Sequence, residues 1–342
     1  MKSTIQTVPM PFNFATIGLN HGHIYGQTEA MLNAGCTLTR FAAEEDDLAA
    51  RYAEAFPQAT RCTEAEIMAD ESIRLIVAAP IPCTRAALAI RAMEAGKDVM
   101  VDKPGCLSLD ELAAIKESQQ ATGRIWSVLY SEHYRQKATT RALQLVREGA
   151  IGKVIHMTGF GPHRIGDYGN RYPWFWDPAQ NGSILTDIAA HQFEQFLAFT
   201  GAASARVLQA SEANHAHPQY PGFTDYGHAV VEADTGALGF LRVDWFTPAG
   251  SPVWGDGRCF LTGTTGTIEL RKYMDIEGRP GADHLFLTDA QGTRHIDCSD
   301  TQLPYGAALR DDVLNRSETA MPQAHCFHAT ELALQAAALA SS

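Results

Sequence analysis

A chain of 342 residues with 45% hydrophobic and 19% charged residues suits one large globular domain or two ordinary ones. The net charge of −12 comes without a basic run, which argues against nucleic acid binding, and no stretch approaches the ~18 continuous apolar residues of a membrane span. Seven scattered cysteines without a Cys-x-x-Cys pair, and an N-terminus without the apolar core of a signal peptide, predict a reduced, cytoplasmic protein.

Strands and helices alternate over the first 130 residues. The predicted strands are 14–18, 36–41, 74–79, 98–101 and 125–130, and the predicted helices are about 26–33, 48–56, 84–95 and 109–122. Such alternation with short links is typical of a doubly wound parallel sheet covered on both faces. We therefore assign residues 1–130 to a dinucleotide-binding α/β domain of the Rossmann type.

The turn after the first strand is a candidate dinucleotide site. A strand that leads through glycines into a helix presents backbone N–H groups to a pyrophosphate. The motif is degenerate, because Asn20 and His23 stand at the second and third glycine positions counted from Gly18. Roles in packing or in starting the helix remain open for the two histidines. The residues expected at the cofactor are Gly18, Asn20, His21, Gly22, His23 and Ile24.

The acid that would hold the ribose hydroxyls is displaced in this chain. Alanine stands where the acid aligns after the second strand, and Glu44 follows it. Glu44 could serve NAD, or it could be a helix N-terminal acid that interacts with the helix dipole. Because no arginine stands beside Glu44 to favour a 2′-phosphate, we expect NAD, with NADP not excluded.

Lys103 follows the predicted strand 98–101 directly. Pro104 disfavours helical geometry at Lys103, so the lysine is held extended where the strand ends. Ligands of open parallel sheets bind at the carboxyl ends of the strands. Lys103 is therefore a candidate to meet a ligand oxygen, although a surface lysine on a loop is the alternative.

The second half of the chain changes character. Its predicted strands are 153–160, 205–213, 225–233, 237–246, 258–262 and 267–270, joined largely by short turns. This pattern predicts a mostly antiparallel sheet in an α+β domain of residues 131–342. Helices are expected at 183–199 and 325–340, and the last one is a candidate to pack back on the first domain. An exposed sheet face would need covering, so we expect a homo-oligomer, a dimer or a tetramer.

Asp187 and His191 stand four residues apart in the predicted helix 183–199, so both project from one helix face. An aspartate beside a histidine can orient the ring and favour its charged form, which suits a general base. A helix-surface ion pair is the alternative. Ahead of this helix, three aromatic residues that include Trp176 lie between two prolines, where they could wall a pocket or belong to the core.

Several landmarks fall in one order along the chain. They are Ala79-Pro80, then Ala95-Gly-Lys-Asp-Val-Met-Val-Asp-Lys-Pro104, then Gly149-Ala-Ile-Gly152, and finally Gly182-Ser-Ile-Leu-Thr-Asp-Ile-Ala-Ala-His191. Over nearly its whole length the chain resembles the glucose–fructose oxidoreductase / inositol dehydrogenase / rhizopine catabolism (Gfo/Idh/MocA) family. The second and fourth motifs, at this separation, carry the resemblance.

The resemblance implies a Rossmann domain that binds NAD(P) and a second domain with an open-faced, mostly antiparallel sheet. It implies that Lys103, Asp187 and His191 are catalytic, and that Ala79, Pro80 and Lys103 lie at the cofactor. Members mostly oxidise or reduce sugars, cyclitols and related polyhydroxy compounds. Some instead recycle a tightly held NAD in elimination or glycoside cleavage, so a lyase or glycosidase is an alternative function.

Two stretches depart from the family pattern. Ile81-Pro-Cys-Thr84 replaces an asparagine and a histidine, and Tyr130-Ser-Glu-His-Tyr134 replaces an asparagine and an arginine. The candidate substrate residues are Tyr130, His133 and Trp176. Because the glycine turn is degenerate, a non-catalytic member that binds cofactor poorly is a further alternative.

The three motif residues also fit alcohol oxidation on chemical grounds. His191 can take the hydroxyl proton, Lys103 can stabilise the developing alkoxide, and Asp187 can orient His191 or hold a neighbouring hydroxyl. A metal is not expected, because the pairs His21-Gly-His23 and His215-Ala-His217 lack a third ligand at recognisable spacing. A nucleophilic hydrolase is not supported, because no Gly-x-Ser-x-Gly elbow occurs.

Overall fold

The computed structural model of the protein describes residues 12–166 and 172–341. The first domain contains a six-stranded sheet in the order β3-β2-β1-β4-β5-β6, and each neighbouring pair is parallel. This is the doubly wound order of a Rossmann sheet, as predicted. Its strands are β1 (Asn13–Ile17), β2 (Thr37–Ala42), β3 (Thr60–Arg61), β4 (Ile73–Ala78), β5 (Asp98–Asp102) and β6 (Trp126–Leu129). The short β3 is not among the predicted strands, because two exposed residues carry no alternating pattern.

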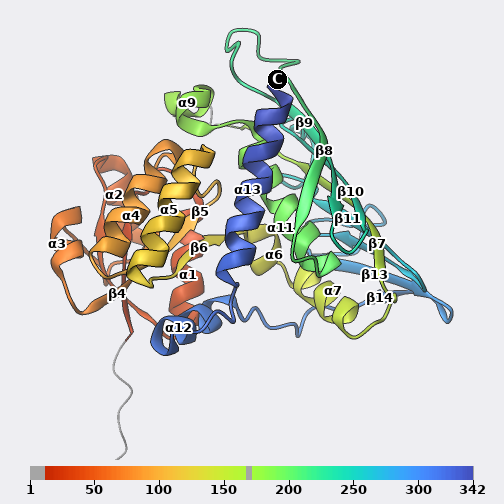
Figure 1. The fold of residues 1–342 in the computed structure, drawn as a ribbon, viewed down its shortest axis with the longest axis horizontal. Helices are drawn as coiled ribbons and strands as arrows, with labels where there is room; N and C mark the ends of the chain where they lie inside the picture. Colours follow the sequence, from red (N-terminus) through yellow and green to blue (C-terminus); the bar gives the residue numbers. More distant parts are fainter. Residues whose placement is uncertain (1–11, 167–171, 342) are drawn as a thin grey trace, which may run out of the picture.

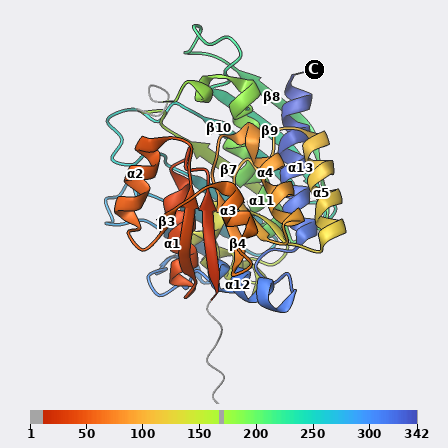
Figure 2. The same cartoon turned by 90° about the vertical axis from the view of Figure 1, so that its left-hand side faces the viewer.

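Helices cover both faces of this sheet, because successive side chains of each strand point to opposite sides. In β1, Phe14 packs in one hydrophobic cluster and Ala15 in the other. The first cluster lies under α1 (His23–Asn33), α2 (Asp46–Ala55) and α12 (Tyr305–Asn315); the second lies under α3 (Glu64–Ala69), α4 (Arg85–Glu94) and α5 (Leu109–Thr122). Figure 2 shows the two layers on either side of the strands.

The second domain is built on an eight-stranded sheet in the order β14-β13-β12-β11-β7-β10-β9-β8. All neighbours are antiparallel except β7 and β10, which run parallel. The strands are β7 (Val154–Pro162), β8 (Ala205–Ala213), β9 (Tyr226–Ala233), β10 (Leu238–Asp244), β11 (Arg258–Gly263), β12 (Thr267–Arg271), β13 (His284–Asp289) and β14 (Gly292–Ile296). The mostly antiparallel sheet is confirmed, and β13 and β14 extend it beyond the predicted strands.

One face of this sheet is covered by helices and the other is not. The covering helices are α7 (Lys137–Arg147), α11 (Ala189–Thr200) and α13 (Gln323–Ala340). On the opposite face, alternate side chains of β9 and β10 are only half-buried. Helix α13 also packs against α5 and β6, and the rings of Trp126 and Phe327 stack with their centroids 5.1 Å apart. The C-terminal helix therefore lies between the two sheets (Figure 1).

The predicted helix 183–199 is interrupted. It consists of α10 (Ile184–Asp187) and α11, which are separated at Ile188. The remaining short elements are α6 (Ser131–Tyr134), α9 (Pro178–Asn181) and the 3₁₀ turns η1 (Pro82–Thr84) and η2 (Pro173–Trp176).

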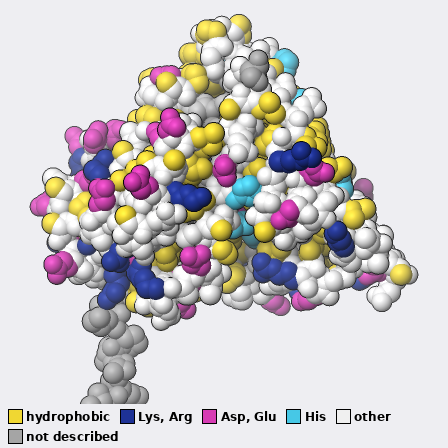
Figure 3. All heavy atoms as spheres, viewed as in Figure 1, with side chains coloured by type: hydrophobic (Ala, Val, Ile, Leu, Met, Phe, Trp, Pro, Cys, Tyr) yellow, Lys and Arg dark blue, Asp and Glu magenta, His cyan; other side chains and the backbone are white. Residues whose placement is uncertain are grey.

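The distribution of charged side chains on the surface agrees with the lack of a basic run in the sequence. Acidic and basic side chains are interspersed on the face drawn in Figure 3. Across residues 12–166 and 172–341, no helix combines the length and the apolar character needed to cross a membrane.

Candidate active site between the two domains

Lys103 and Asp187 meet across the junction of the two domains. Lys103 follows β5, before a cis bond to Pro104, and Asp187 is the last residue of α10. The Lys103 Nζ atom lies 2.5 Å from Asp187 Oδ1, and the two residues are only 3% and 6% exposed. Two of the three predicted catalytic residues therefore form one buried ion pair.

His191 lies in the first turn of α11 and is 1% exposed. Burial lowers the pKa of its imidazole to about 3; Glu132 opposes this shift, while Lys103, His23 and His163 add to it. The ring is therefore neutral near pH 7. Its Nδ1 atom has no hydrogen-bond partner among the described residues.

The expected contact between Asp187 and His191 is not made in the described structure. The chain tightens between the two helices, because the backbone N–H of His191 donates to the carbonyl of Ile188, three residues earlier. The carboxylate of Asp187 binds Lys103 instead. The spacing of four residues therefore did not predict the partner of Asp187.

Three further residues of the site were missed by sequence reasoning: Glu132 in α6, His163 after β7 and Lys272 after β12. Glu132 Oε2 accepts hydrogen bonds from Lys272 Nζ (2.6 Å) and Gln192 Nε2 (2.9 Å), and its Oε1 lies 3.8 Å from His163 Nε2. Burial alone would raise the pKa of Glu132, but Lys272, His191 and His163 outweigh it and hold the pKa well below its usual range. The sequence signal that pointed to Glu132 was the departure of residues 130–134 from the family pattern.

The turn after β1 explains why Gly18 is required. Its φ is +75°, and a Cβ atom there would lie 2.4 Å from Pro80 Cβ. The Gly18 carbonyl accepts from the N–H of Ala79, whose carbonyl accepts from the N–H of His21. Gly18, Ala79, Pro80 and His21 are thus brought together where β1 and β4 end. Helix α1 begins at His23, one turn earlier than predicted, with Ile24 buried beneath it.

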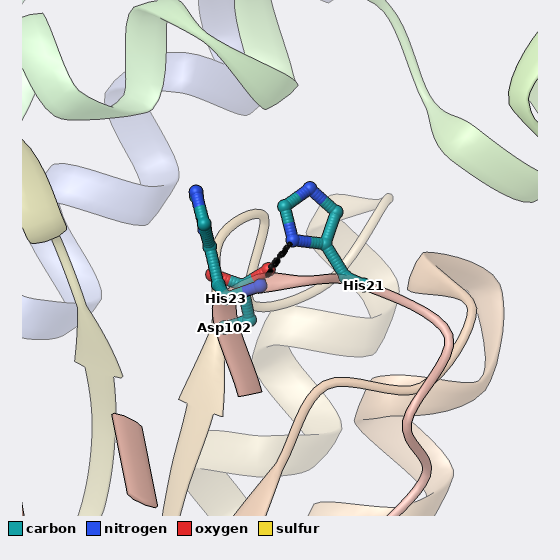
Figure 4. Close-up of side chains that lie close together, drawn as sticks. All are labelled: His21, His23 and Asp102. Atoms are coloured by element: carbon teal, nitrogen blue, oxygen red, sulfur yellow. Dashed lines mark hydrogen bonds and ion pairs between the residues drawn. The ribbon is translucent and has the colours of Figure 1, made fainter. Parts of the chain in front are cut away.

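His21 and His23 both contact Asp102, the last residue of β5 (Figure 4). The Nδ1 atoms lie 3.1 and 2.9 Å from Asp102 Oδ2 and Oδ1, respectively. Burial lowers the pKa of His21 well below its usual value, against the opposing effect of Asp102. The buried guanidinium of Arg85 also lies 3.3 Å from Asp102 Oδ2 and donates to the carbonyls of Pro80 and Pro104.

His21, His23 and Asp102 together could hold a metal ion. Asp102 is the third ligand that the sequence analysis did not find. Two imidazole nitrogens and a carboxylate oxygen lie within 4.8 Å of one another, which is a composition that divalent transition metals accept. The Arg85 cation on the same carboxylate opposes a dication there. The expectation of no metal stays a prediction.

A cavity of about 840 Å³ opens beside the turn, at the carboxyl ends of β1, β2 and β4. Gly18, Asn20, Glu44 and Pro80 line it, together with Glu45, the N-cap residue of α2. Asn20 Nδ2 donates to Glu45 Oε1 at 2.6 Å. The volume, the helix start and the two acids after β2 fit a dinucleotide with free ribose hydroxyls. Glu45 adds an acid that the sequence analysis did not single out.

The three predicted substrate residues are placed differently. The Tyr130 hydroxyl lies 3.0 Å from Thr330 Oγ1 in α13, and His133 Nδ1 lies 2.8 Å from Glu194 Oε1 in α11. Both side chains are buried in these contacts, and their role as substrate residues stays a prediction. Trp176 stacks on Tyr220 at 4.1 Å, in an aromatic cluster that also contains Phe175 and Phe223.

Two family models match the chain. The model described as "Oxidoreductase family, NAD-binding Rossmann fold" matches residues 12–130, and the model described as "GFO/IDH/MocA C-terminal domain" matches residues 139–269. The chain belongs to the Gfo/Idh/MocA family. As a Gfo/Idh/MocA protein it is an oxidoreductase, and its first domain is an NAD-binding Rossmann domain, as the sequence analysis expected.

Known Gfo/Idh/MocA proteins resemble the chain to different degrees. A putative oxidoreductase from Erwinia carotovora atroseptica superposes with a TM-score of 0.93 at 39% identity, covering 96% of this chain and 98% of that one. The scyllo-inositol 2-dehydrogenase (NAD(+)) of Bacillus subtilis is 27% identical over 239 residues, which are 67% of this chain and 66% of that enzyme. The chain thus spans just under two thirds of that relative.

A levoglucosan dehydrogenase, solved with NADH and levoglucosan, shares the fold with a TM-score of 0.77 at 20% identity and covers 96% of this chain and 97% of its own.

Proposed function

We propose that the protein is an NAD-dependent dehydrogenase that interconverts a secondary alcohol and a ketone on a sugar, cyclitol or related polyhydroxy compound. The observation that carries the proposal is the buried Lys103–Asp187 pair, which stands next to the neutral imidazole of His191. The inositol and levoglucosan dehydrogenases among the relatives support the substrate class. We expect the protein to act in the cytoplasm.

NAD, when bound, accepts or supplies the hydride, which is chemistry that no side chain can perform. Gly18, Asn20, Pro80 and the acids Glu44 and Glu45 would hold it, since they line the cavity beside the turn. The Lys103 ammonium stabilises negative charge on the reacting oxygen, and burial strengthens this effect by excluding water. Neutral His191 accepts the hydroxyl proton.

Asp187 holds Lys103 in place and balances its charge inside the protein. Both lysines of the described site, Lys103 and Lys272, already pair with a carboxylate. Neither is left over to neutralise an acidic group of the substrate. This arrangement favours a neutral polyhydroxy compound over a sugar acid.

The proposal is tested by nucleotide titration followed by a substrate panel. NADH and NADPH are titrated into the protein and followed by energy transfer from its five tryptophans. Inositols, levoglucosan and hexoses are then offered with NAD⁺, and the absorbance of the reduced nicotinamide is recorded. We expect NADH binding and NADH formation with at least one neutral compound. Failure to bind either nucleotide would point to a non-catalytic member.

A denatured sample is examined for nucleotide carried through purification. Product formation without net change in nicotinamide absorbance, together with retained nucleotide, would replace the dehydrogenase by the lyase or glycosidase that recycles NAD. Oxidation of only acidic substrates would overturn the charge argument while leaving the reaction type intact.

We also propose a homo-oligomer that pairs through the uncovered face of the eight-stranded sheet. Half-buried aromatic rings of Phe160 and Phe260 lie edge to face there, with centroids 6.1 Å apart, and Leu238 is 43% exposed. Apolar side chains such as these on an uncovered sheet face favour contact with a second copy over contact with water. The order, dimer or tetramer, is measured by light scattering.

A further inference from the structure

Glu132 is a buried carboxylate with one unused oxygen. Glu132 is 2% exposed, and its Oε2 atom accepts from Lys272 Nζ and Gln192 Nε2. Its Oε1 atom is buried and has no hydrogen-bond partner among the described residues. Buried carboxylate oxygens rarely remain without a partner, because the lost hydration costs about 1–3 kcal/mol or more.

The unused oxygen faces an imidazole nitrogen. His163 is 8% exposed, and its Nδ1 lies 3.1 Å from the carbonyl oxygen of Gly161. A carbonyl can only accept, so Nδ1 carries the proton of the neutral ring and Nε2 carries a lone pair. That Nε2 lies 3.8 Å from Glu132 Oε1. Two acceptors therefore face one another inside the protein.

The pair of Glu132 and His163 can take up one proton. Two facing lone pairs repel at low dielectric, and a proton on His163 Nε2 would turn the repulsion into a charge-assisted hydrogen bond. The groups that act on His163 come from several elements: Glu132 in α6, Lys103 after β5 and Asp187 in α10. Burial and Lys103 lower the pKa of His163, and Glu132, the Gly161 carbonyl and Asp187 offset this only in part.

His191, in the first turn of α11, acts electrostatically on this pair. Its Nδ1 is also buried and without a partner among the described residues, and Glu132 and His163 are both among the groups that act on its charge, with Lys103 and His23. Burial makes a protonated His191 more acidic than an ordinary imidazolium. It can be a useful base only if the proton it accepts has somewhere to go.

We propose that Glu132 and His163 form a proton-holding pair that receives the substrate proton from His191. The inference rests on the proposed dehydrogenase function. The O–H bond of the substrate breaks as an N–H bond forms on His191; that bond then breaks as the Nε2–H bond of His163 forms. The hydride that leaves the substrate carbon goes to NAD⁺, the oxidant of the proposed reaction. Glu132 is a positioning residue, and reduction of a ketone runs the same path in reverse.

The pair is tested without any substrate, by NMR of the full chain labelled with ¹⁵N-histidine and saturated with NADH. His163 is assigned by the loss of its signals in His163→Gln. At neutral pH we expect the proton on Nδ1, and on acidification we expect a second proton on Nε2. In Glu132→Gln the protonation of His163 should move at least one pH unit lower. His156→Gln, in β7 and half-buried, should leave the His163 titration unchanged.

Two results would overturn the proposal. One is a neutral His163 with its proton on Nε2, since that nitrogen would already donate to Glu132. The other is a His163 titration that is the same with and without the Glu132 carboxylate. Glu132→Gln leaves Lys272 without its counter-ion, so the double variant Glu132→Gln/Lys272→Met removes both charges and provides the same readout if the single variant does not fold.

A kinetic measurement separates this inference from the proposed function. With any compound that the panel shows to be oxidised, His163→Gln should lower kcat about 10- to 100-fold and move its pH dependence, while KM and the Kd of NADH stay within about 2-fold. Unchanged kcat and pH dependence would exclude the proton path even if the pair titrates as expected. If the panel yields no substrate, the proposed function fails, and the NMR titration still decides whether the pair exists.

Discussion

The Nζ atom of Lys103 lies 2.5 Å from Oδ1 of Asp187, although the two residues are 84 positions apart and belong to different domains. Lys103 is held by the Rossmann sheet and Asp187 by the helix pair that covers the second sheet. The contact therefore defines the candidate catalytic centre and ties the two domains at the same point. Its two roles can be separated experimentally.

Removing one partner of this pair should cost both activity and stability. Lys103→Met should lower turnover about 100- to 1,000-fold, because the reacting oxygen loses its cation, while NADH binding stays nearly intact. Asp187→Asn leaves a buried ammonium uncompensated and should lower the free energy of unfolding by about 3–5 kcal/mol. Steady-state kinetics and urea denaturation measure the two effects.

The double variant Lys103→Met/Asp187→Leu separates the two roles. It should recover most of the lost stability, because no buried charge is left, but none of the lost turnover. The exposed Lys153→Met is the matched control and should behave as wild type. Turnover of Lys103→Met within 2-fold of wild type would contradict the catalytic role.

The free energy of unfolding should decrease as the pH is lowered, partly because of His191. Burial lowers its pKa from the usual 6.5 to about 3 in the folded protein. Below pH 6.5 the unfolded chain therefore binds more protons than the folded one, and stability is lost progressively as the pH falls from 6.5 towards 3. The share of this one histidine is about 2 kcal/mol at pH 5.

His191→Gln cannot titrate and should flatten this part of the pH dependence, measured as the difference in unfolding free energy between pH 7 and pH 5. Some dependence should remain, since burial also lowers the pKa values of His21 and His163. The same slope in wild type and variant would show that His191 is not held neutral by burial.

Gly18→Ala should damage the cofactor turn. The new Cβ would meet Pro80 at 2.4 Å on a backbone whose φ of +75° already disfavours alanine. We expect a loss of about 1–3 kcal/mol of stability and at least 10-fold weaker NADH binding. Gly22→Ala is the comparison for stability, because nothing lies within 4 Å of its Cβ and its φ is −60°. Equal melting temperatures of the two variants would refute the steric argument.

Arg85 should be required for the shape of the site although it lies outside it. Its guanidinium is fully buried and donates to the carbonyls of Pro80 and Pro104 and to Asp102. Arg85→Lys cannot make these contacts together, so we expect a loss of about 2–4 kcal/mol in stability and weaker NADH binding. The exposed Arg147→Lys, at the end of α7, should change neither. A stable Arg85→Lys protein with normal NADH affinity would count against this bracing role.

The uncovered sheet face should decide the oligomeric state. Phe240→Asp places a charge on this face, between β7 and β9, where a second copy would pack. If the homo-oligomer pairs there, light scattering should report a smaller mass for the variant, with little change in its circular dichroism. Leu109→Asp, an exposed apolar residue at the start of α5, should leave the mass unchanged. A monomeric mass for the wild-type protein would rule out this interface.

Local patterns in the sequence were enough for the architecture. Alternating strands and helices over the first 130 residues predicted the parallel sheet, since apolar periodicity and helix end signals act within one element. The second half read as a largely antiparallel sheet for the same reason. Lys103, Asp187 and His191 were found from two motifs, and the structure brings Lys103 and Asp187 into contact.

Pairing between distant residues was decided only by the tertiary structure. A spacing of four predicted that Asp187 serves His191, but in the folded chain its carboxylate binds Lys103. Asp102 stands 79 positions from His23, and Glu132 stands 140 positions from Lys272. Such contacts have no local signature, because they depend on which elements the whole chain packs side by side. The sequence by itself determined the elements and the motif residues; the packing of the two domains determined their charged partners.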